Sequence, residues 1–164
     1  MEKIKRIIFV CTGNTCRSPM AEHLLRDMIE NSEELAKDNW EILSAGISAI
    51  KGVKASDKTE EVMRELNLDL SDHISRNIET IELKKSDIIL TMSRKHSRFL
   101  ILDHTDLADN IFTLKEFAEN KNGKDIEDPF GLSLQVYRDT RDEIKLELEK
   151  ILQKLKDFNP KEKD

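Results

Sequence analysis

The chain has 164 residues, of which 37% are charged, and its formal net charge is −6. A chain of this length is typical of one domain with its own hydrophobic core. The acidic balance gives no electrostatic support for nucleic-acid binding. No apolar run approaches the ~18 residues that a membrane-spanning helix needs. We therefore expect neither a nucleic-acid partner nor a membrane partner.

The two ends of the chain and its cysteines bear on location and domain organisation. The first six residues lead directly into an apolar run, which leaves no room for a signal peptide. Cys11 and Cys16 stand in one short segment and do not form a disulfide framework. We expect a cytoplasmic protein with one domain over residues 1–158. A polar C-terminal tail would follow at 159–164.

The apolar residues follow strand and helix periods in alternation. Strands are predicted over residues 7–10, 40–45, 87–92 and 111–114. Helices are predicted from Pro19 to about Ile29, after residues 55–58, over 94–102 and from near Ser133 onward. Ser56 or Asp57 would cap the second helix, and a charged loop would run from the fourth strand to Asp128. Such alternation favours an α/β fold whose parallel sheet is covered by helices on both faces.

The segment from Cys11 to Ser18 joins the first predicted strand to the first predicted helix. A helix begins with backbone N–H groups that lack intrahelical partners, and the positive end of the helix dipole lies behind them. Gly13 and Asn14 tolerate a positive φ, which a loop that folds its amides inward requires. The sequence therefore predicts an anion-binding loop at this position.

Two side chains turn this anion site into a candidate reaction centre. Cys11 ends the strand, and we expect loop amides, a helix N-terminus and the hydroxyl of Ser18 to stabilise its thiolate. Arg17 has a planar set of donors that matches two oxygens of a phosphate. A thiolate below a bound phosphate is a nucleophile directed at phosphorus. The alternative is a buried structural cysteine beside a surface arginine.

The run Cys-Thr-Gly-Asn-Thr-Cys-Arg-Ser at 11–18 resembles the signature loop of the low-molecular-weight protein tyrosine phosphatases. The Asp-Pro-Phe-Gly at 128–131 resembles their late acid loop, and the Ser-Ala-Gly at 44–46 and His73 also fit. The resemblance covers nearly the whole chain. Thr15 and the Asp-Pro-Phe-Gly form are most similar to bacterial protein arginine phosphatases. Tyrosine phosphatases of this family usually carry an aliphatic residue at the position of Thr15 and a tyrosine after the Asp-Pro.

The resemblance implies a four-stranded parallel sheet of order 2-1-3-4 and a reaction through a cysteinyl-phosphate. It implies that Cys11 is the nucleophile, that Arg17 holds the phosphate, and that Asp128 is the general acid. On the residues alone, an Asp before Pro is most often a turn former. The phosphate would be bound by Thr12, Gly13, Asn14, Thr15, Cys16 and Ser18. The substrates would be phosphorylated proteins, and the product inorganic phosphate.

Thr15 and Phe130 bear on the choice of substrate. A hydroxyl at Thr15 can accept a hydrogen bond from the guanidinium of phosphoarginine, whereas an aliphatic side chain favours an aromatic ring. Alternatively, the Thr15 hydroxyl makes hydrogen bonds only within its own loop and does not contact the substrate. Phe130 would form an apolar wall for the substrate side chain, or it would only pack against the rest of the protein. We expect a phosphoarginine phosphatase, with a phosphotyrosine phosphatase as the alternative.

Cys16 and His73 each have two interpretations. Cys16 can condense with an oxidised Cys11 to a protective disulfide, or it can fill space behind the loop. His73 matches a family position that braces Asn14, or it lies in a surface loop. The other three histidines show no ligand spacing with each other or with a cysteine, so we expect no metal and no cofactor.

Two other classes of function are open to the same scaffold. A thiol-dependent arsenate reductase passes oxidation to further cysteines, and this chain has none after Cys16. A non-catalytic phosphate-binding module would not need Cys11, Arg17 and Asp128 together. The sequence does not name the protein substrates or the oligomeric state.

Overall fold

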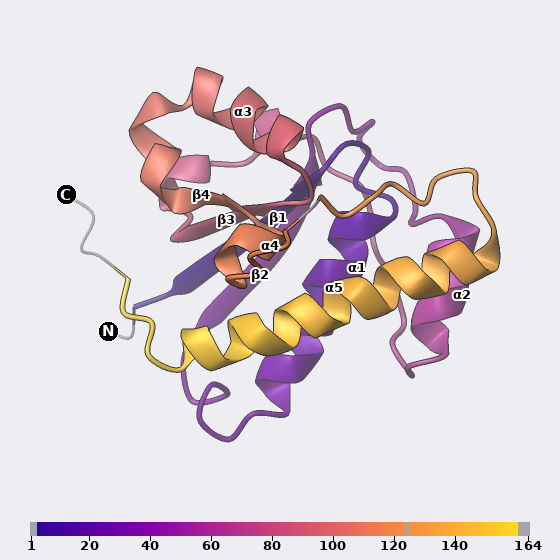
Figure 1. Cartoon of the computed structure of the whole chain (residues 1–164), viewed down its shortest axis with the longest axis horizontal. Coiled ribbons are helices and arrows are strands. Elements are labelled where there is room, and N and C mark those ends of the chain that lie inside the picture. The colour runs from indigo at the N-terminus through magenta and orange to yellow at the C-terminus, as the bar shows by residue number, and fades with distance from the viewer. Residues whose placement is uncertain (1–2, 124, 161–164) are drawn as a thin grey trace.

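The computed structural model describes residues 3–123 and 125–160, and within them a parallel sheet of four strands (Figure 1). The strand order is β2-β1-β3-β4, which confirms the predicted α/β fold and its order 2-1-3-4. The strands are β1 (Lys5–Cys11), β2 (Trp40–Gly46), β3 (Ile88–Thr91) and β4 (Ile111–Thr113).

Helices cover both faces of the sheet, as the alternating pattern predicts (Figure 1). Helices α1 (Arg17–Glu30) and α5 (Leu134–Leu155) lie on one face, with α2 (Asp57–Arg64) packed against α5. Helix α3 (Arg94–Asp103) lies on the other face, together with 3-10 turns at Ile78–Thr80, Leu83–Lys85 and Thr105–Asn110. A short helix, α4 (Leu114–Phe117), follows β4 directly.

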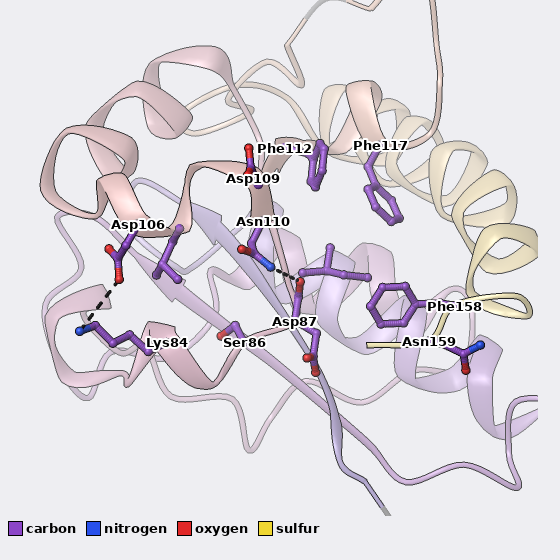
Figure 2. A pocket seen from close by; sticks show the side chains of 12 residues that line it. Lys84, Ser86, Asp87, Asp106, Asp109, Asn110, Phe112, Phe117, Phe158 and Asn159 are labelled. Atoms are coloured by element: carbon purple, nitrogen blue, oxygen red, sulfur yellow. Dashed lines mark hydrogen bonds and ion pairs between the residues drawn. The ribbon is translucent and has the colours of Figure 1, made fainter. Parts of the chain in front are cut away.

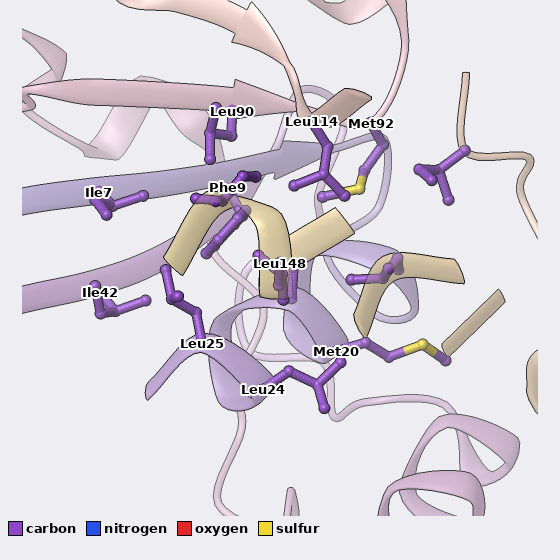
Figure 3. Packing of buried hydrophobic residues seen from close by; sticks show 14 of the residues in the cluster. Ile7, Phe9, Met20, Leu24, Leu25, Ile42, Leu90, Met92, Leu114 and Leu148 are labelled. Atoms are coloured by element: carbon purple, nitrogen blue, oxygen red, sulfur yellow. The ribbon is translucent and has the colours of Figure 1, made fainter. Parts of the chain in front are cut away.

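Strand β1 lies at the centre of the sheet and separates two hydrophobic clusters. Side chains alternate along a strand, so Ile7 and Phe9 enter the cluster beneath α1 and α5, and Ile8 and Val10 enter the cluster beneath α3. Figure 3 shows the first cluster, where Phe9 lies among side chains of α1 and α5 such as Leu25 and Leu148. Burying a side chain of this size stabilises the fold by roughly 1.5–3 kcal/mol. The first strand is therefore fixed on both faces.

The parallel register brings the carboxyl ends of the strands to one edge of the sheet. Cys11 pairs with Gly46 of β2, and Val10 pairs with Thr91 of β3. The loops that follow β1, β2 and β3 consequently emerge side by side. This edge is where an open parallel sheet of this kind places its ligands.

The predicted end of the fourth strand is wrong. Leu114 does not end a strand but begins α4, because the Thr113 hydroxyl accepts from the Glu116 N–H and the Glu116 carboxylate accepts from the Thr113 N–H. This capping box starts a helix inside the segment that was predicted as strand and loop.

Of the two residues predicted to cap the second helix, Ser56 is the cap, since the Ser56 hydroxyl accepts from the Thr59 N–H.

The polar tail predicted at 159–164 is described only as far as Pro160, and residues 161–164 lie outside the described part of the chain. Pro160 O accepts a hydrogen bond of 3.0 Å from Lys3 Nζ. The domain boundary at 158 stays a prediction. Among residues 3–123 and 125–160, no helix combines the length and apolar character that crossing a bilayer requires.

Candidate active site

The phosphate loop, which we define as residues 11–18, carries the buried sulfur of Cys11 at the end of β1. Two groups of the same loop approach this sulfur. The Ser18 Oγ lies 2.9 Å from Cys11 Sγ, and the Asn14 backbone N–H donates to Sγ over 3.3 Å. Two polar groups of the loop thus converge on the sulfur.

The N-terminus of α1 faces the same loop. The helix begins at Arg17, and Cys16, its N-cap residue, makes no side-chain cap hydrogen bond. The first hydrogen bond of the helix runs from Met20 N to Cys16 O at 3.2 Å. The N–H groups of the first turn therefore have no acceptor within the helix and are available to an anion.

Asn14 holds the loop in shape from behind. Its φ of 57° is in the left-handed region, which asparagine tolerates better than most residues. The side chain is fully buried; its Nδ2 donates to Ser18 Oγ and Ser44 Oγ at 2.8 and 2.9 Å, and its Oδ1 accepts from Arg76 N at 3.0 Å. His73 Nε2 donates to Asn14 O at 2.8 Å, which places this predicted bracing residue against the loop.

Gly46 lets β2 approach the phosphate loop closely. A Cβ at this position would lie 2.5 Å from Thr12 O and 2.9 Å from Asn14 N, closer than real Cβ contacts. These two atoms belong to backbone and cannot move aside cheaply. A glycine is therefore required where the Ser-Ala-Gly motif supplies one.

Arg17 and Asp128 meet although they are far apart in sequence. The Arg17 side chain is nearly buried; its Nη1 donates to Ile126 O at 2.8 Å, and its Nη2 lies 3.6 Å from Asp128 Oδ2. The Asp128 side chain is half exposed, and its Oδ1 accepts from the Phe130 N–H at 3.2 Å. The guanidinium thus anchors the acid loop beside the phosphate loop.

A pocket of about 200 Å³ opens above the sulfur. It contains eight of the residues that the sequence singles out: Cys11, Thr12, Gly13, Thr15, Cys16, Arg17, Asp128 and Phe130. Phe130 is 72% exposed and stands at the rim. Asn14, Ser18 and His73 do not line the pocket but lie behind the loop, as the contacts above require. The structure therefore brings all the predicted site residues together in one place.

The outer half of the phosphate loop rests on α2 and α5. Ser56 N donates to Thr15 O at 3.0 Å, and the Cys16 sulfur lies 3.5 Å from both Ser56 Oγ and Tyr137 Oη. Burial, followed by the hydrogen bond to Cys16, raises the pKa of Tyr137 to about 12, so its hydroxyl stays protonated. Both cysteines are free thiols. Cys16 packs against the polar ends of two helices.

His96 is a site residue that the sequence analysis missed. Its Nε2 lies 2.8 Å from Thr12 Oγ1, and its Nδ1 lies 2.9 Å from Ser93 Oγ. Burial, then the nearby charge of Arg17, lowers the pKa of His96 to about 4. The imidazole is therefore neutral near pH 7, so one ring nitrogen donates and the other accepts. The only local hint in the sequence is Ser93, three positions before His96, which is a residue type that commonly caps a helix.

A larger pocket, of about 550 Å³, lies at the opposite edge of the sheet, where β3 and β4 begin. Figure 2 shows Phe112, Phe117 and Phe158 on one side of it and the acidic side chains of Asp106 and Asp109 on another. None of the residues predicted for the site lines this pocket. The thiol, the guanidinium and the acid instead share the smaller one.

Comparison with known proteins gives one consistent result. The family model described as low molecular weight phosphotyrosine protein phosphatase matches residues 6–161. A protein-arginine-phosphatase of Bacillus subtilis is 38% identical over 150 residues, which cover 92% of this chain and 96% of the relative. The low molecular weight protein-tyrosine-phosphatase PtpB of Staphylococcus aureus is 36% identical over 153 residues, 93% of this chain and 98% of the relative.

A solved structure shares both the fold and this level of identity. It is described as the YwlE arginine phosphatase, a mutant with a phosphorylated active-site serine. It superposes with a TM-score of 0.83 at 36% identity, covering 93% of this chain and 96% of its own. The fold, the arrangement of the site and the matches agree, and the chain belongs to the low molecular weight phosphotyrosine protein phosphatase family.

Proposed function

We propose that this protein is a cysteine-dependent protein phosphatase that hydrolyses phosphoarginine on proteins. The observation that carries the proposal is the shared pocket, which combines the Cys11 sulfur, the Arg17 guanidinium and the Asp128 carboxylate with the hydroxyl residue Thr15 at its wall. Relatives named protein-arginine-phosphatase, 38% and 37% identical, support the choice of substrate.

In the first step the Cys11 thiolate attacks phosphorus in line with the leaving group. A sulfur–phosphorus bond forms, and the bond between phosphorus and the guanidine nitrogen breaks. That nitrogen keeps the electron pair of the broken bond and takes the proton of Asp128, so the charged guanidinium of the substrate leaves as the ordinary guanidinium of arginine. Arg17 and the loop N–H groups hold the equatorial oxygens, and their contribution is positioning and charge stabilisation.

In the second step water hydrolyses the cysteinyl-phosphate. Asp128 is now a carboxylate and accepts a proton from the attacking water, whose oxygen bonds to phosphorus while the sulfur–phosphorus bond breaks. Phosphate leaves, and the thiolate is restored with a hydrogen bond from Ser18. The solved relative with a phosphorylated active-site serine supports a covalent intermediate at this position of the fold.

Thr15 is the residue on which the substrate preference rests. It lines the pocket, and its backbone is held by Ser56, so the hydroxyl stands on a fixed part of the wall. A hydroxyl oxygen can accept from the guanidinium of phosphoarginine. A hydrogen bond to a charged group is worth about 1.5–3 kcal/mol, on the order of tenfold to a hundredfold in preference. Phe130 would cover the apolar stem of the substrate side chain.

A tyrosine phosphatase is the second candidate. The exposed ring of Phe130 can stack on an aromatic substrate as well as on an arginine stem, and a relative 36% identical carries the tyrosine-phosphatase name. The deciding experiment measures kcat/KM on matched phosphoarginine and phosphotyrosine peptides with a chelator present. Our proposal predicts higher efficiency on phosphoarginine. Higher efficiency on phosphotyrosine would establish the alternative.

The partners of this reaction are phosphorylated proteins as substrates and inorganic phosphate as the product. A thiolate nucleophile works only while it is reduced, so we also propose a cytoplasmic location, where thiols are kept reduced.

A further inference from the structure

Glu22 and His23 of α1 come close to His73 behind the phosphate loop, in an arrangement that the spacing of histidines in the sequence did not indicate. One ligand atom from each of the three side chains lies within 4.8 Å of the other two. We propose that Glu22, His23 and His73 form a site for a zinc ion that acts as a structural clamp on this loop. The site would be separate from the pocket above Cys11 and would take no part in the chemical steps.

The three donors are of kinds that bind zinc, and a water molecule would complete the tetrahedral shell. Imidazole nitrogens and carboxylate oxygens bind zinc at about 2.0–2.2 Å, and tetrahedral geometry then places ligand atoms roughly 3.4 Å apart. Glu22 Oε2 and His23 Nε2 already lie 3.4 Å apart. The rings of His23 and His73 meet edge to face, with centroids 6.2 Å apart. The third ligand atom, on His73, lies within 4.8 Å of the other two.

His73 is prepared for this role by its other contact. Asn14 O can only accept, so His73 Nε2 carries the hydrogen of their 2.8 Å bond. In the neutral ring the lone pair is then on Nδ1. Metal-binding histidines usually donate their second ring N–H to a backbone carbonyl or a carboxylate in this way, which fixes tautomer and orientation.

A positive charge beside the ligands bears on zinc binding. The Arg26 guanidinium lies 2.9 Å from Glu22 Oε2 and would have to move. Its side chain is 41% exposed, and to leave Glu22 it would also have to give up the hydrogen bond of 2.9 Å from its Nη2 to Ile42 O. Arg26 thus competes with the metal for the Glu22 carboxylate.

A bound ion would connect α1 to the segment that holds the phosphate loop. Glu22 Oε1 accepts from Ser44 Oγ at 2.7 Å, and Ser44 Oγ in turn accepts from the side chain of Asn14. Since the ion would take Oε2, this chain of bonds can persist. We therefore expect zinc to stabilise the folded protein against heat.

The test uses the full-length Cys11→Ser protein, because the substitution removes the reactive thiolate as a competing zinc ligand. Zinc affinity is measured by calorimetry. The melting temperature is measured with and without zinc. Cobalt serves as a spectroscopic probe, since tetrahedral cobalt absorbs strongly in the visible range. We expect zinc to raise the melting temperature and cobalt to give this absorption.

Two variants in that background move the affinity in opposite directions. His23→Gln removes a ligand and should weaken zinc binding at least about tenfold. Arg26→Gln removes a competing positive charge and should tighten it about threefold or more. His104→Gln, a matched change of a half-buried histidine on the other face of the sheet, should leave the affinity unchanged.

The proposal is overturned if zinc fails to bind, or if both His23→Gln and Arg26→Gln leave its affinity unchanged. It is also overturned if cobalt binds without the tetrahedral absorption. If His23→Gln does not fold, the decision passes to Arg26→Gln, since no other zinc site in this chain is expected to tighten when that guanidinium is removed.

Discussion

The hydroxyl of Ser18 is aimed at the sulfur of Cys11 by a third side chain. Ser18 Oγ accepts from Asn14 Nδ2 at 2.8 Å and lies 2.9 Å from Cys11 Sγ. The Asn14 amide can only donate to this oxygen and a thiolate can only accept, so the hydrogen of the hydroxyl is directed to the sulfur. The thiolate then receives one donor from Ser18 and one from the backbone of Asn14.

Ser18→Ala is expected to lower kcat about ten- to hundredfold, since a hydrogen bond to a charged group is worth about 1.5–3 kcal/mol. The alkylation rate of Cys11 by iodoacetamide at pH 6 should fall as well, because only the thiolate reacts. Ser97→Ala is the control; its hydroxyl bonds to Thr91 Oγ1 at 2.6 Å, away from the pocket. An unchanged alkylation rate in Ser18→Ala would contradict the assignment.

Cys11→Ser is expected to abolish turnover while phosphate binding remains measurable. The loop amides and Arg17 hold the anion, and neither depends on the sulfur. Steady-state assays on a phosphopeptide and calorimetry with inorganic phosphate separate the two properties. Turnover at the wild-type rate would show that another group is the nucleophile.

Asp128→Asn is expected to reduce kcat about 10²–10⁴-fold, the usual contribution of general acid–base catalysis. Asparagine keeps the acceptor for the Phe130 N–H, so the loop should retain its turn. Phosphate affinity should be retained, and Asp139→Asn on the exposed face of α5 should behave like the wild type. If kcat of Asp128→Asn were unaffected, the proton would have to come from elsewhere.

Thr15→Ile is expected to shift relative kcat/KM from phosphoarginine toward phosphotyrosine by about tenfold or more, because the substrate guanidinium loses an acceptor. The comparison is made on matched peptides. Thr80→Ile, at an exposed position far from the pocket, controls for the added apolar surface. An unchanged ratio of the two activities would remove Thr15 from the specificity argument.

His96 makes the stability of the protein depend on pH. Its pKa is about 4 in the folded state against an ordinary 6.5, so the unfolded chain binds more protons between these values and stability falls on acidification. The difference corresponds to up to about 3 kcal/mol. In His96→Gln the loss of unfolding free energy between pH 7 and pH 4.5 should be smaller, as urea denaturation would show. His104→Gln should keep the wild-type slope.

The sequence was most informative where contacts are local. The strand, the loop and the helix start that hold Cys11, Asn14 and Arg17 are consecutive, so apolar period and residue type predicted their structure directly. Asp128 was different, since an Asp before a Pro is ordinarily a turn former, and only the family resemblance gave it a role. Its meeting with Arg17 depends on how α5 and the acid loop pack.

Contacts between residues that are far apart in the sequence were not predicted. Thr12 and His96 are 84 positions apart, and no pattern in a single sequence connects them. The surroundings of Cys16 depend on Tyr137, which the sequence analysis did not place in the site. Helix α4 was missed because Thr113 reads as a strand residue until its bonds with Glu116 are seen.

The distance along the chain between Cys16 and Tyr137 has a consequence for biosynthesis. Cys11 is synthesised well before the tyrosine that packs under its loop, because Tyr137 follows 121 positions after Cys16. The acid loop and the helix that closes the core are also made late. A chain terminated before Tyr137 would therefore carry the Cys11 thiol without the tyrosine contact and without the helix that closes the core.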